Sequence, residues 1–416
     1  MRRTSRLAGV LGILALLIAA CGGGTDATTT TAAEATTTTA GGAEETTTTV
    51  GAPTGDPIVL GGIFALTGPS SFVASQSAGG IQLAVAEINA AGGVLGRPLE
   101  ANVQDDQCQP AEGVSAARRL IEVEDVRLII GAQCSSSTLA IMPVLQELEA
   151  LMINTASTNP AITEQGGVGG NPWIFRNNPP DSAFAPAMAK IMADQGVKKL
   201  AVVAVNDDLG RGAAEEFRKA LQVHGSDITF EHFFSREGQL DFSSALTEIR
   251  ESDADAILFV GTIDPGLPFL RQYRELGLTQ PLYSRGLSLT KQLFDEAGDV
   301  ANGLHSTEPY YVEIDSPENQ RFIEAFRAMH DMDPVYQAYT AYEAVYLYAA
   351  AIEAAGSTEP EAVRAALESV TREAITGTMT FDDHHQAHIP VYVARATCEA
   401  TCRVEIVGSD DTWGNR

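Results

Sequence analysis

The sequence predicts an α/β protein with two lobes, each built on a parallel sheet that helices cover. Short apolar runs alternate with amphipathic stretches from residue 58 onward, which is typical of strands and helices joined by right-handed crossovers. The chain has 416 residues, enough for two or three domains with cores of their own. Its 44% of hydrophobic residues, with 38 Gly, 19 Pro and only 6% aromatic residues, fits an Ala- and Val-rich chain with many turns.

The expected strands are apolar runs that are too short for helices. Residues 58–65 have the continuous apolar character of a strand buried on both faces, and the turn residues Thr67-Gly68-Pro69 follow them. The other expected strands cover residues 99–103, 126–130, 151–154, 173–176, 200–205, 228–234, 256–260 and 282–284.

The expected helices lie between these runs, where apolar residues recur at helical spacing. In residues 81–89 this spacing is followed by Gly92-Gly93, which ends the helix. The next expected helices cover residues 111–123, 138–149, 183–194, 213–223, 243–251 and 268–276. Three further helical patterns follow at residues 319–330, 335–355 and 359–370, before a strand-rich end at residues 376–407.

A lobe boundary is expected at Asn177-Asn178-Pro179-Pro180, between a strand and a new helix. The late helices are expected to return to the first lobe, and the strand-rich end to the second. Both lobes would then be discontinuous in sequence.

The first residues have the pattern of an export signal. Arg2, Arg3 and Arg6 precede an apolar run at residues 7–20, which is too short for a stable membrane span. The run ends in Ile18-Ala19-Ala20-Cys21, which resembles a bacterial lipobox, so residues 1–20 are expected to be a lipoprotein signal peptide and Cys21 the lipidated residue. An ordinary cleaved signal followed by an unrelated cysteine is the alternative.

Residues 21–56 are predicted to be a disordered tether. They contain thirteen threonines between Thr25 and Thr49, interspersed with Ala, Gly and Glu, and cannot build a core. Such a segment would hold a folded body away from the membrane. A recognition or glycosylated stalk has the same composition.

The charge balance excludes some classes of partner. The chain carries 54 Asp and Glu against 27 Lys and Arg, a net charge of −27. Binding to nucleic acid or to an anionic membrane surface needs a basic surface. We therefore expect no nucleic acid partner, and contact with the membrane only through the lipid anchor.

Four cysteines besides Cys21 fit an oxidising compartment. Cys398 and Cys402 flank a three-residue turn, where a hairpin would bring them close enough to bridge. Two disulfides and one lipidated cysteine would leave no thiol over. Four cysteines allow three pairings, so the residues alone leave the choice open.

Two hydroxyl-rich turns indicate an anion site. Gly131-Ala132-Gln133-Cys134-Ser135-Ser136-Ser137-Thr138 and Thr155-Ala156-Ser157-Thr158-Asn159-Pro160 each follow an expected strand. Hydroxyls and free amides at a helix N-terminus suit a carboxylate or a phosphate, and the two turns would converge where open α/β sheets bind ligands. The alternative is helix capping, which needs only one of these residues.

Other motifs favour binding over catalysis. The sequence has no Walker lysine, Gly-x-Gly-x-x-Gly, Gly-x-Ser-x-Gly or His-Glu-x-x-His motif, so we expect no enzyme activity and no cofactor. His384, His385 and His388 lack a convincing ligand pattern, and no metal is expected. Tyr336, Tyr339, Tyr342 and Tyr346 keep helical spacing and indicate core packing.

A longer pattern resembles a known family. Ile88-Asn89-Ala90-Ala91-Gly92-Gly93-Val94-Leu95-Gly96-Arg97-Pro98-Leu99, followed by Asp105-Asp106 and the turn at residues 134–138, resembles the leucine/isoleucine/valine-binding proteins. These are type I periplasmic solute-binding proteins of branched-chain amino-acid ABC transporters. The similarity extends from residue 56 to about residue 407, and includes Phe269-Leu270-Arg271-Gln272 and residues 377–383.

The resemblance implies a type I periplasmic-binding-protein fold, with two Rossmann-like lobes that close on a solute like a hinged trap. Three crossings would lie near Asn177, Thr307 and Thr376. The first lobe would then comprise residues 57–177 and 307–376, and the second residues 178–306 and 377–416. The resemblance also implies a disulfide between Cys108 and Cys134.

The resemblance also implies a ligand site. Ser135 and Thr158 match hydroxyls that hold the ligand α-carboxylate, and Ala156 matches a carbonyl that accepts from the ammonium. Phe72 matches an aromatic residue of the family pattern near Gly68. In the second lobe, Leu209 stands where an aromatic residue is usual, Thr262 or Ile263 where a tyrosine is usual, and Arg285 where a carboxylate is usual.

Arg285 departs most from the pattern, because a carboxylate for the ammonium is usual at this turn. Either Arg285 reads a second anionic group of the ligand, or Asp207, Asp208 or Asp264 holds the ammonium. A third alternative is that Arg285 points outward to an ion pair.

These inferences predict a lipid-anchored, extracytoplasmic solute-binding subunit of an ABC importer, on the outer face of a bacterial cell membrane. Its ligand would be an amino acid of the branched-chain type or a related small carboxylate. Permease and ATPase subunits would be separate chains. The alternatives are an extracytoplasmic sensor that signals to a separate receptor, or a binder of an aromatic acid, an amide or a dicarboxylate.

Overall fold

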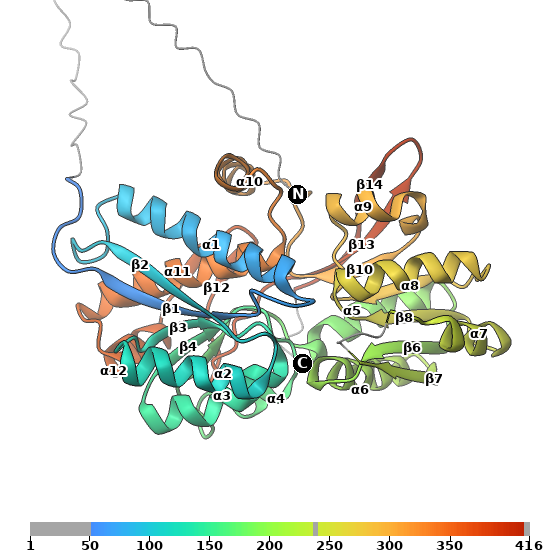
Figure 1. Ribbon diagram of the computed structural model, residues 1–416, viewed down its shortest axis with the longest axis horizontal. Coiled ribbons are helices and arrows are strands. Elements are labelled where there is room, and N and C mark those ends of the chain that lie inside the picture. The colour runs from blue at the N-terminus through green and yellow to red at the C-terminus, as the bar shows by residue number, and fades with distance from the viewer. Residues whose placement is uncertain (1–50, 236–239, 412–416) are drawn as a thin grey trace, which may run out of the picture. The chain divides into compact units, whose positions relative to one another are not determined.

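The computed structural model describes residues 51–235 and 240–411. The expected signal peptide, Cys21 and nearly all of the expected tether lie outside the described residues. Figure 1 shows two sheets side by side, each flanked by helices. In the part of the chain that the structure describes, no helix is both long enough and apolar enough to cross a membrane.

The first sheet is parallel, with the strand order β2-β1-β3-β4-β5. Its strands are β1 Ile58–Phe64, β2 Leu99–Asp105, β3 Leu128–Gly131, β4 Leu151–Asn154 and β5 Ile174–Arg176. Its helices are α1 Ser71–Ala90, α2 Pro110–Arg118, α3 Ser135–Leu148 and α4 Ala161–Glu164, joined late in the chain by α10 Pro317–His330, α11 Tyr336–Ala355 and α12 Pro360–Leu367. A π-helical turn, η1 Arg119–Val123, extends α2. The expected strand and helix alternation is confirmed in this lobe.

Helix α11 is held against the first lobe by its tyrosines and by a close approach to α1. The Tyr348 hydroxyl donates to the carbonyls of Ile129 (2.8 Å) and Leu151 (3.0 Å), on β3 and β4. A Cβ added at Gly80 of α1 would collide with the carbonyl oxygen of Ala338, so only glycine lets the two helices pack this closely. These contacts explain why a helix from late in the chain completes the first core.

The second sheet has the order β14-β13-β10-β9-β8-β6-β7. Its strands are β6 Lys199–Val205, β7 Asp227–Phe234, β8 Ala256–Val260, β9 Leu282–Arg285, β10 His305–Glu308, β13 Val391–Cys398 and β14 Cys402–Asp410. Its helices are α5 Asp181–Asp194, α6 Asp208–Val223, α7 Ser243–Glu251, α8 Ile263–Glu275 and α9 Lys291–Ala297, with the 3-10 turn η2 Gly298–Ala301. β13 and β14 form an antiparallel hairpin on the edge of an otherwise parallel sheet.

Strand β6 shows why apolar runs without polar alternation form the centre of this sheet. Ala201, Val203 and Val205 pack into the core beneath α7, α8 and α9. Leu200, Val202 and Ala204, the intervening residues, pack into a second core with α5 and α6. Both faces of the strand are buried, as expected for a parallel sheet with helices on each side.

The cores also locate the crossings between the lobes, where the structure departs from the expected boundaries. β10 continues the second sheet through Glu308, one residue past the expected crossing at Thr307. Met379, Ala387 and Ile389 pack into the first core, and Val391 begins the second. The third crossing therefore follows Ile389 and does not lie near Thr376, because the short hairpin of β11 Arg372–Ala374 and β12 Gly377–Met379 still belongs to the first lobe.

We propose lobes of residues 57–177 with 309–390, and 178–308 with 391–411. The first and third crossings lie side by side, because the Arg176 Nε donates to the Gln386 Oε1 at 2.6 Å and the two residues form a parallel bridge. Arg176 is buried, and the crossings therefore share a hydrogen-bonded interior.

The cysteines lie in two pairs. A disulfide joins Cys108 and Cys134, whose Cα atoms are 5.4 Å apart, and another joins Cys398 and Cys402, with Cα atoms 3.9 Å apart. The first connects the turn after β2 to the turn after β3, and so ties down the start of α3. The second closes the tip of the β13–β14 hairpin.

Candidate functional site

The two hydroxyl-rich turns meet at the carboxyl edge of the first sheet. Ser135 is the first residue of α3, and its side chain is buried. Its Oγ accepts hydrogen bonds from the amides of Thr158 and Asn159, both at 3.3 Å. Ser135 therefore does not cap its own helix but joins the turn after β3 to the turn after β4, and its hydroxyl hydrogen remains available to a ligand oxygen.

Thr158 and Ala156 are tied to the first crossing. The Thr158 hydroxyl donates to Asp181 Oδ2 at 2.9 Å, and its carbonyl accepts from the Asp181 amide at 2.7 Å. The Ala156 carbonyl accepts from Asn178 Nδ2 at 3.1 Å. Because Asn178 and Asp181 belong to the crossing and the start of α5, this turn is hydrogen-bonded directly to the first crossing.

A second layer of polar groups supports these turns. Asn154 Nδ2 donates to the carbonyls of Gly131 (3.1 Å) and Ala132 (2.8 Å), and the hydroxyls of Thr138 and Ser157 lie 2.7 Å apart. These residues are buried. The support layer fixes the turns before any ligand arrives.

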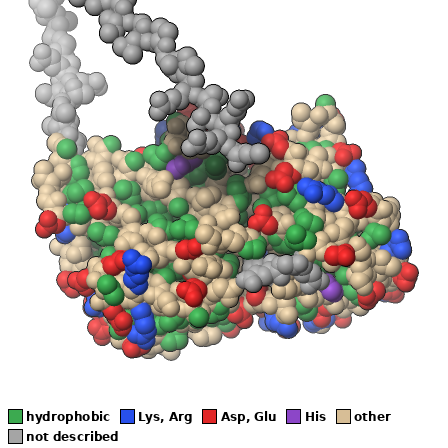
Figure 2. All heavy atoms as spheres, viewed as in Figure 1, with side chains coloured by type: hydrophobic (Ala, Val, Ile, Leu, Met, Phe, Trp, Pro, Cys, Tyr) green, Lys and Arg blue, Asp and Glu red, His purple; other side chains and the backbone are tan. Residues whose placement is uncertain are grey.

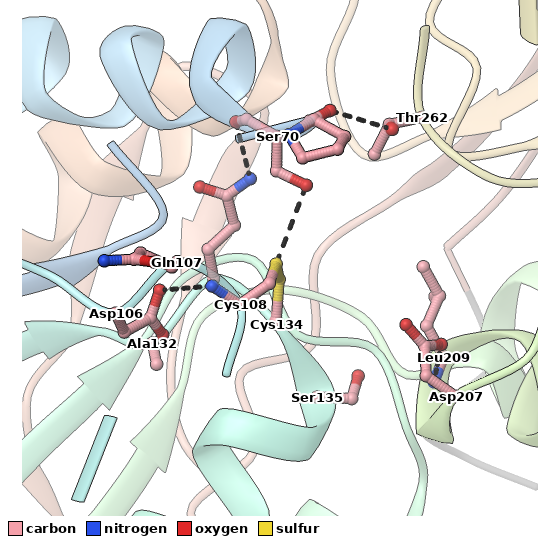
Figure 3. The surroundings of a disulfide bond; sticks show 12 residues. Ser70, Asp106, Gln107, Cys108, Ala132, Cys134, Ser135, Asp207, Leu209 and Thr262 are labelled. Atoms are coloured by element: carbon pink, nitrogen blue, oxygen red, sulfur yellow. Dashed lines mark hydrogen bonds between the residues drawn. A yellow bond between two sulfur atoms is a disulfide. The ribbon is translucent and has the colours of Figure 1, made fainter. Parts of the chain in front are cut away.

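The expected residues of the second lobe lie at two helix starts. Leu209 is the second residue of α6, and Ile263 is the first residue of α8. Ile263 packs into the second core, whereas the Thr262 hydroxyl donates to the Pro69 carbonyl of the first lobe at 3.3 Å. Figure 3 draws Ser135 on α3, with Leu209 and Thr262 on other segments of the chain. Of the two residues at the start of α8, Thr262 therefore faces the first lobe and Ile263 packs into the second core.

Phe72, near the start of α1, lies between the lobes. Its half-buried ring belongs to the first lobe by sequence but packs against the second core. Phe72 is therefore placed where closure of the lobes would bury it further.

Arg285 forms a buried ion pair. Its Nε lies 3.1 Å from Asp181 Oδ1, and its guanidinium stacks 3.8 Å over the ring of Phe184. The side chains of Arg285 and Asp181 are 1% and 0% exposed. One alternative predicted from the sequence was an Arg285 that points outward to an ion pair. Arg285 does have an ionic partner, but the pair lies inside the protein and not on its outer surface. Its Nη2 has no hydrogen-bond partner among the residues that the structure describes.

The two members of this pair remain charged at neutral pH. Burial raises the pKa of Asp181 to about 6, against the opposing effect of Arg285 and Thr158. Burial alone would lower the pKa of Arg285, but Asp181, Tyr336 and Glu308 together outweigh it and the pKa is raised. The pair is therefore neutral as a whole and offers no free carboxylate.

Glu308 and Tyr336 complete this cluster, and neither was singled out as a ligand candidate from the sequence. Glu308 ends β10, is buried, and accepts a hydrogen bond from the Ser288 hydroxyl. Burial raises the pKa of Glu308 to about 8, despite Ser288 and Arg285, so its side chain is mostly protonated at pH 7. Tyr336, the first residue of α11, is buried, and burial raises its pKa to about 12.

A cavity of about 1220 Å³ adjoins the cluster. Phe72, Glu308 and Tyr336 line it, with Tyr310 and Tyr311, whereas the residues that surround Ser135 do not. Eight Asp and Glu residues lie on its wall, against Lys291 and Arg403 as the only cationic lining residues. The two hydroxyl-rich turns of the first sheet thus lie outside the lining of this cavity, whose wall is acidic and aromatic.

The four tyrosines at helical spacing on α11, Tyr336, Tyr339, Tyr342 and Tyr346, have two kinds of surroundings. Tyr339 stacks on Tyr310 with ring centroids 5.0 Å apart, and Tyr342 and Tyr346 both donate to Glu87 Oε2 on α1. These three residues confirm the expected core packing. Tyr336 instead lines the cavity, because it begins the helix at the edge of the core.

The three aspartates proposed for an ammonium have other surroundings. Asp207 caps α6, and its Oδ1 accepts from the amides of Leu209 (3.0 Å) and Gly210 (3.2 Å). Asp208 and Asp264 are exposed.

The histidines near residue 385 have structural partners. His385 stacks on Phe175 with ring centroids 3.9 Å apart, and His388 Nε2 lies 2.8 Å from Asp382 Oδ2. Within the described residues, no group of three or more His, Cys, Asp and Glu side chains is arranged to hold a metal ion.

Asp181 is the main residue of this candidate site that sequence reasoning missed. The only signal was a carboxylate in the first turn of a helix directly after the crossing Asn177-Asn178-Pro179-Pro180. Such a residue usually serves the helix dipole, and its partner in β9 is distant in sequence.

Comparisons with known proteins show the family and the fold of the chain. Residues 57–401 match the family model described as periplasmic binding protein. A leucine-, isoleucine-, valine-, threonine- and alanine-binding protein of Pseudomonas aeruginosa is 30% identical over 320 residues, which are 76% of this chain and 84% of the relative.

Two solved structures are also similar. A leucine-binding protein of Thermotoga maritima has a TM-score of 0.77 at 26% identity, covering 85% of this chain and 99% of that one. A solute-binding protein of an ABC transporter from R. palustris, in complex with 4-hydroxybenzoate, has a TM-score of 0.77 at 26% identity, covering 86% and 97%.

Proposed function

Because the chain belongs to the periplasmic binding protein family and to its branched-chain amino-acid binding group, we propose that it is the solute-binding subunit of an ABC importer. It captures a small carboxylate, an amino acid of the branched-chain type or a related acid, and delivers it to a membrane permease. The relatives bind solutes and hand them to permease components, and binding with closure of the lobes, not chemistry, is the action that this fold supports.

The observation that carries this proposal is the meeting of Ser135 and Thr158 at the carboxyl edge of the first sheet. A carboxylate at this place receives the Ser135 hydroxyl and lies at the N-terminus of α3, where the helix dipole favours an anion. The Thr158 hydroxyl donates its one hydrogen to Asp181 at the hinge, so the Ser135 hydroxyl is the donor to the carboxylate. Phe72, Leu209 and Thr262 or Ile263 would close over the solute from the other side.

Replacing Ser135 by alanine is expected to weaken carboxylate binding roughly 10- to 150-fold, because a hydrogen bond to a charged group contributes about 1.5–3 kcal/mol. Calorimetry with a series of amino acids and their deaminated analogues measures this loss. The matched control is Ser115→Ala, an exposed serine on α2 that bonds only to the Ala111 carbonyl. Wild-type affinity in Ser135→Ala, or no binding of any carboxylate to the wild type, would contradict the proposal.

We also propose that a lipid on Cys21 holds the protein on the outer face of the membrane, on the strength of the Ile18-Ala19-Ala20-Cys21 pattern. The wild type is expected to partition into the detergent phase of a cell extract, and Cys21→Ala into the aqueous phase. Cys402→Ala is the control for loss of a cysteine elsewhere. Equal partitioning of the wild type and Cys21→Ala would argue against the anchor.

A further inference from the structure

We propose that the ligand of this protein is a carboxylate without an ammonium group, and that Arg285 enforces this choice by occupying Asp181. The inference rests on the proposed function and narrows its ligand class. It makes Arg285 a specificity-determining residue that acts through another residue and does not read a second anionic group of the ligand.

The first step is the position of Asp181. It is a fully buried carboxylate, and it is bonded directly to Thr158, one of the two hydroxyls that we assign to the ligand. An α-ammonium lies one bond beyond the carbon that carries the carboxylate, so it would sit within reach of this side chain. Asp181 is therefore the natural counter-charge for an amino acid in this site.

The second step is that both oxygens of Asp181 are already engaged. Oδ2 accepts from Thr158 at 2.9 Å, and Oδ1 accepts from Arg285 Nε at 3.1 Å. Arg285 is held in place by its stacking on Phe184. An ammonium that paired with Asp181 would add a second cation beside a guanidinium that already balances this carboxylate, and one of the two buried cations would lack a counter-charge at a cost of several kcal/mol.

The third step concerns the other carboxylates near the site. Glu308 bonds to Ser288, and burial keeps its pKa near 8, so it is mostly neutral at pH 7. Asp207 is engaged in capping α6, and Asp208 and Asp264 are exposed. A desolvated ammonium with only the Ala156 carbonyl and the Thr158 hydroxyl as acceptors pays a large cost of burial.

Arg285 offers no free charge to a second anion, because Asp181 neutralises it. A dicarboxylate would therefore bury its second charge without a counter-charge. The aromatic rings of Phe72, Tyr310 and Tyr336 instead suit an apolar or aromatic body. The ligand class is thus a monocarboxylate with an uncharged body.

Matched pairs of ligands test the inference on the wild-type protein by calorimetry at pH 7. The pairs are leucine with 4-methylpentanoate, and phenylalanine with 3-phenylpropanoate, which differ only in the amino group. We expect the deaminated acid of at least one pair to bind 100-fold or more tightly than its amino acid. Tighter binding of leucine or phenylalanine would overturn the inference but leave the proposed function standing. Failure of all four to bind would overturn the inference, and failure of every carboxylate to bind would overturn the proposed function as well.

The variant Arg285→Gln tests the role of Arg285. Releasing Asp181 should reduce the preference for the deaminated acid at least tenfold, because the freed carboxylate can pair with the ammonium. Arg364→Gln is the matched control, since Arg364 also stacks on an aromatic ring, that of Trp173, and pairs with carboxylates, but lies on α12. If Arg285→Gln folds and still prefers the deaminated acid to the same degree, Arg285 does not determine the specificity. If Arg285→Gln does not fold, the ligand pairs measured on the wild type decide the inference.

Two further measurements can overturn the inference. Leucine binding that strengthens about tenfold per unit as the pH rises toward 8 would assign the ammonium to Glu308. Tight binding of succinate or glutarate that is lost in Arg285→Gln would assign a second carboxylate to the unpaired Arg285 Nη2.

Discussion

Replacing Asp181 by alanine is expected to lower the free energy of unfolding by about 3–5 kcal/mol. The variant leaves Arg285 buried and without its ionic partner, and Thr158 without its acceptor. Urea denaturation followed by circular dichroism measures the loss. The matched control is Asp295→Ala, which removes an exposed pair with Lys291 and should cost less than about 1 kcal/mol.

A double variant separates pairing from packing at this position. Asp181→Leu with Arg285→Met removes both charges, and it should recover much of the stability that Asp181→Ala loses, because no buried charge then remains unpaired. A loss below about 1 kcal/mol in Asp181→Ala would mean that Arg285 finds solvent or another partner, which would contradict the buried pair.

Replacing Glu308 by glutamine is expected to stabilise the protein at alkaline pH and to change little near pH 5. The native carboxyl has a pKa of about 8, against an ordinary value of 4.5, because it is buried. Between these values the native state holds a proton that the unfolded state has released. The stability of the wild type therefore falls as the pH rises through this window, by up to about 1.4 kcal/mol per pH unit. Glutamine does not titrate, so the variant lacks this loss.

Thermal or urea unfolding at half-unit steps from pH 5 to 9 measures the difference between the two proteins. Arg285, Tyr336 and Tyr311 face Glu308 from other elements, but they are common to both proteins, and so the difference isolates Glu308. Glu405→Gln, at an exposed pair with Arg395 on the β13–β14 hairpin, serves as the control. If the wild type and Glu308→Gln keep a constant difference across this range, Glu308 does not titrate as described.

The fold could be predicted because the strands and turns of the structure agree with the local patterns of the sequence. The apolar run at residues 200–205 became β6, buried on both faces, and the hydroxyl-rich turns met because parallel strands carry their carboxyl ends to one edge. The third crossing was misplaced because residues 376–407 contain strands of two different sheets. The sequence pattern of a strand does not say which sheet it joins.

The site was only half predictable, for a physical reason. Ser135, Ala156 and Thr158 lie on short turns whose positions follow from the strands before them, so residue type and topology were enough. Arg285 was recognised as a departure from the family pattern, but its partner was not, because Asp181 lies 104 residues away on another element.

The sequence by itself determined the class of fold, the hydroxyl-rich turns that we propose for a carboxylate and the cysteines available for pairing, since each depends on local periodicity and residue chemistry. Only the tertiary structure decided the charge of the site. It placed Arg285 against Asp181, removed both from water, and kept Glu308 protonated beside them. The pKa values and pairings of ionisable groups depend on burial and on neighbours distant in sequence, and a sequence pattern contains neither.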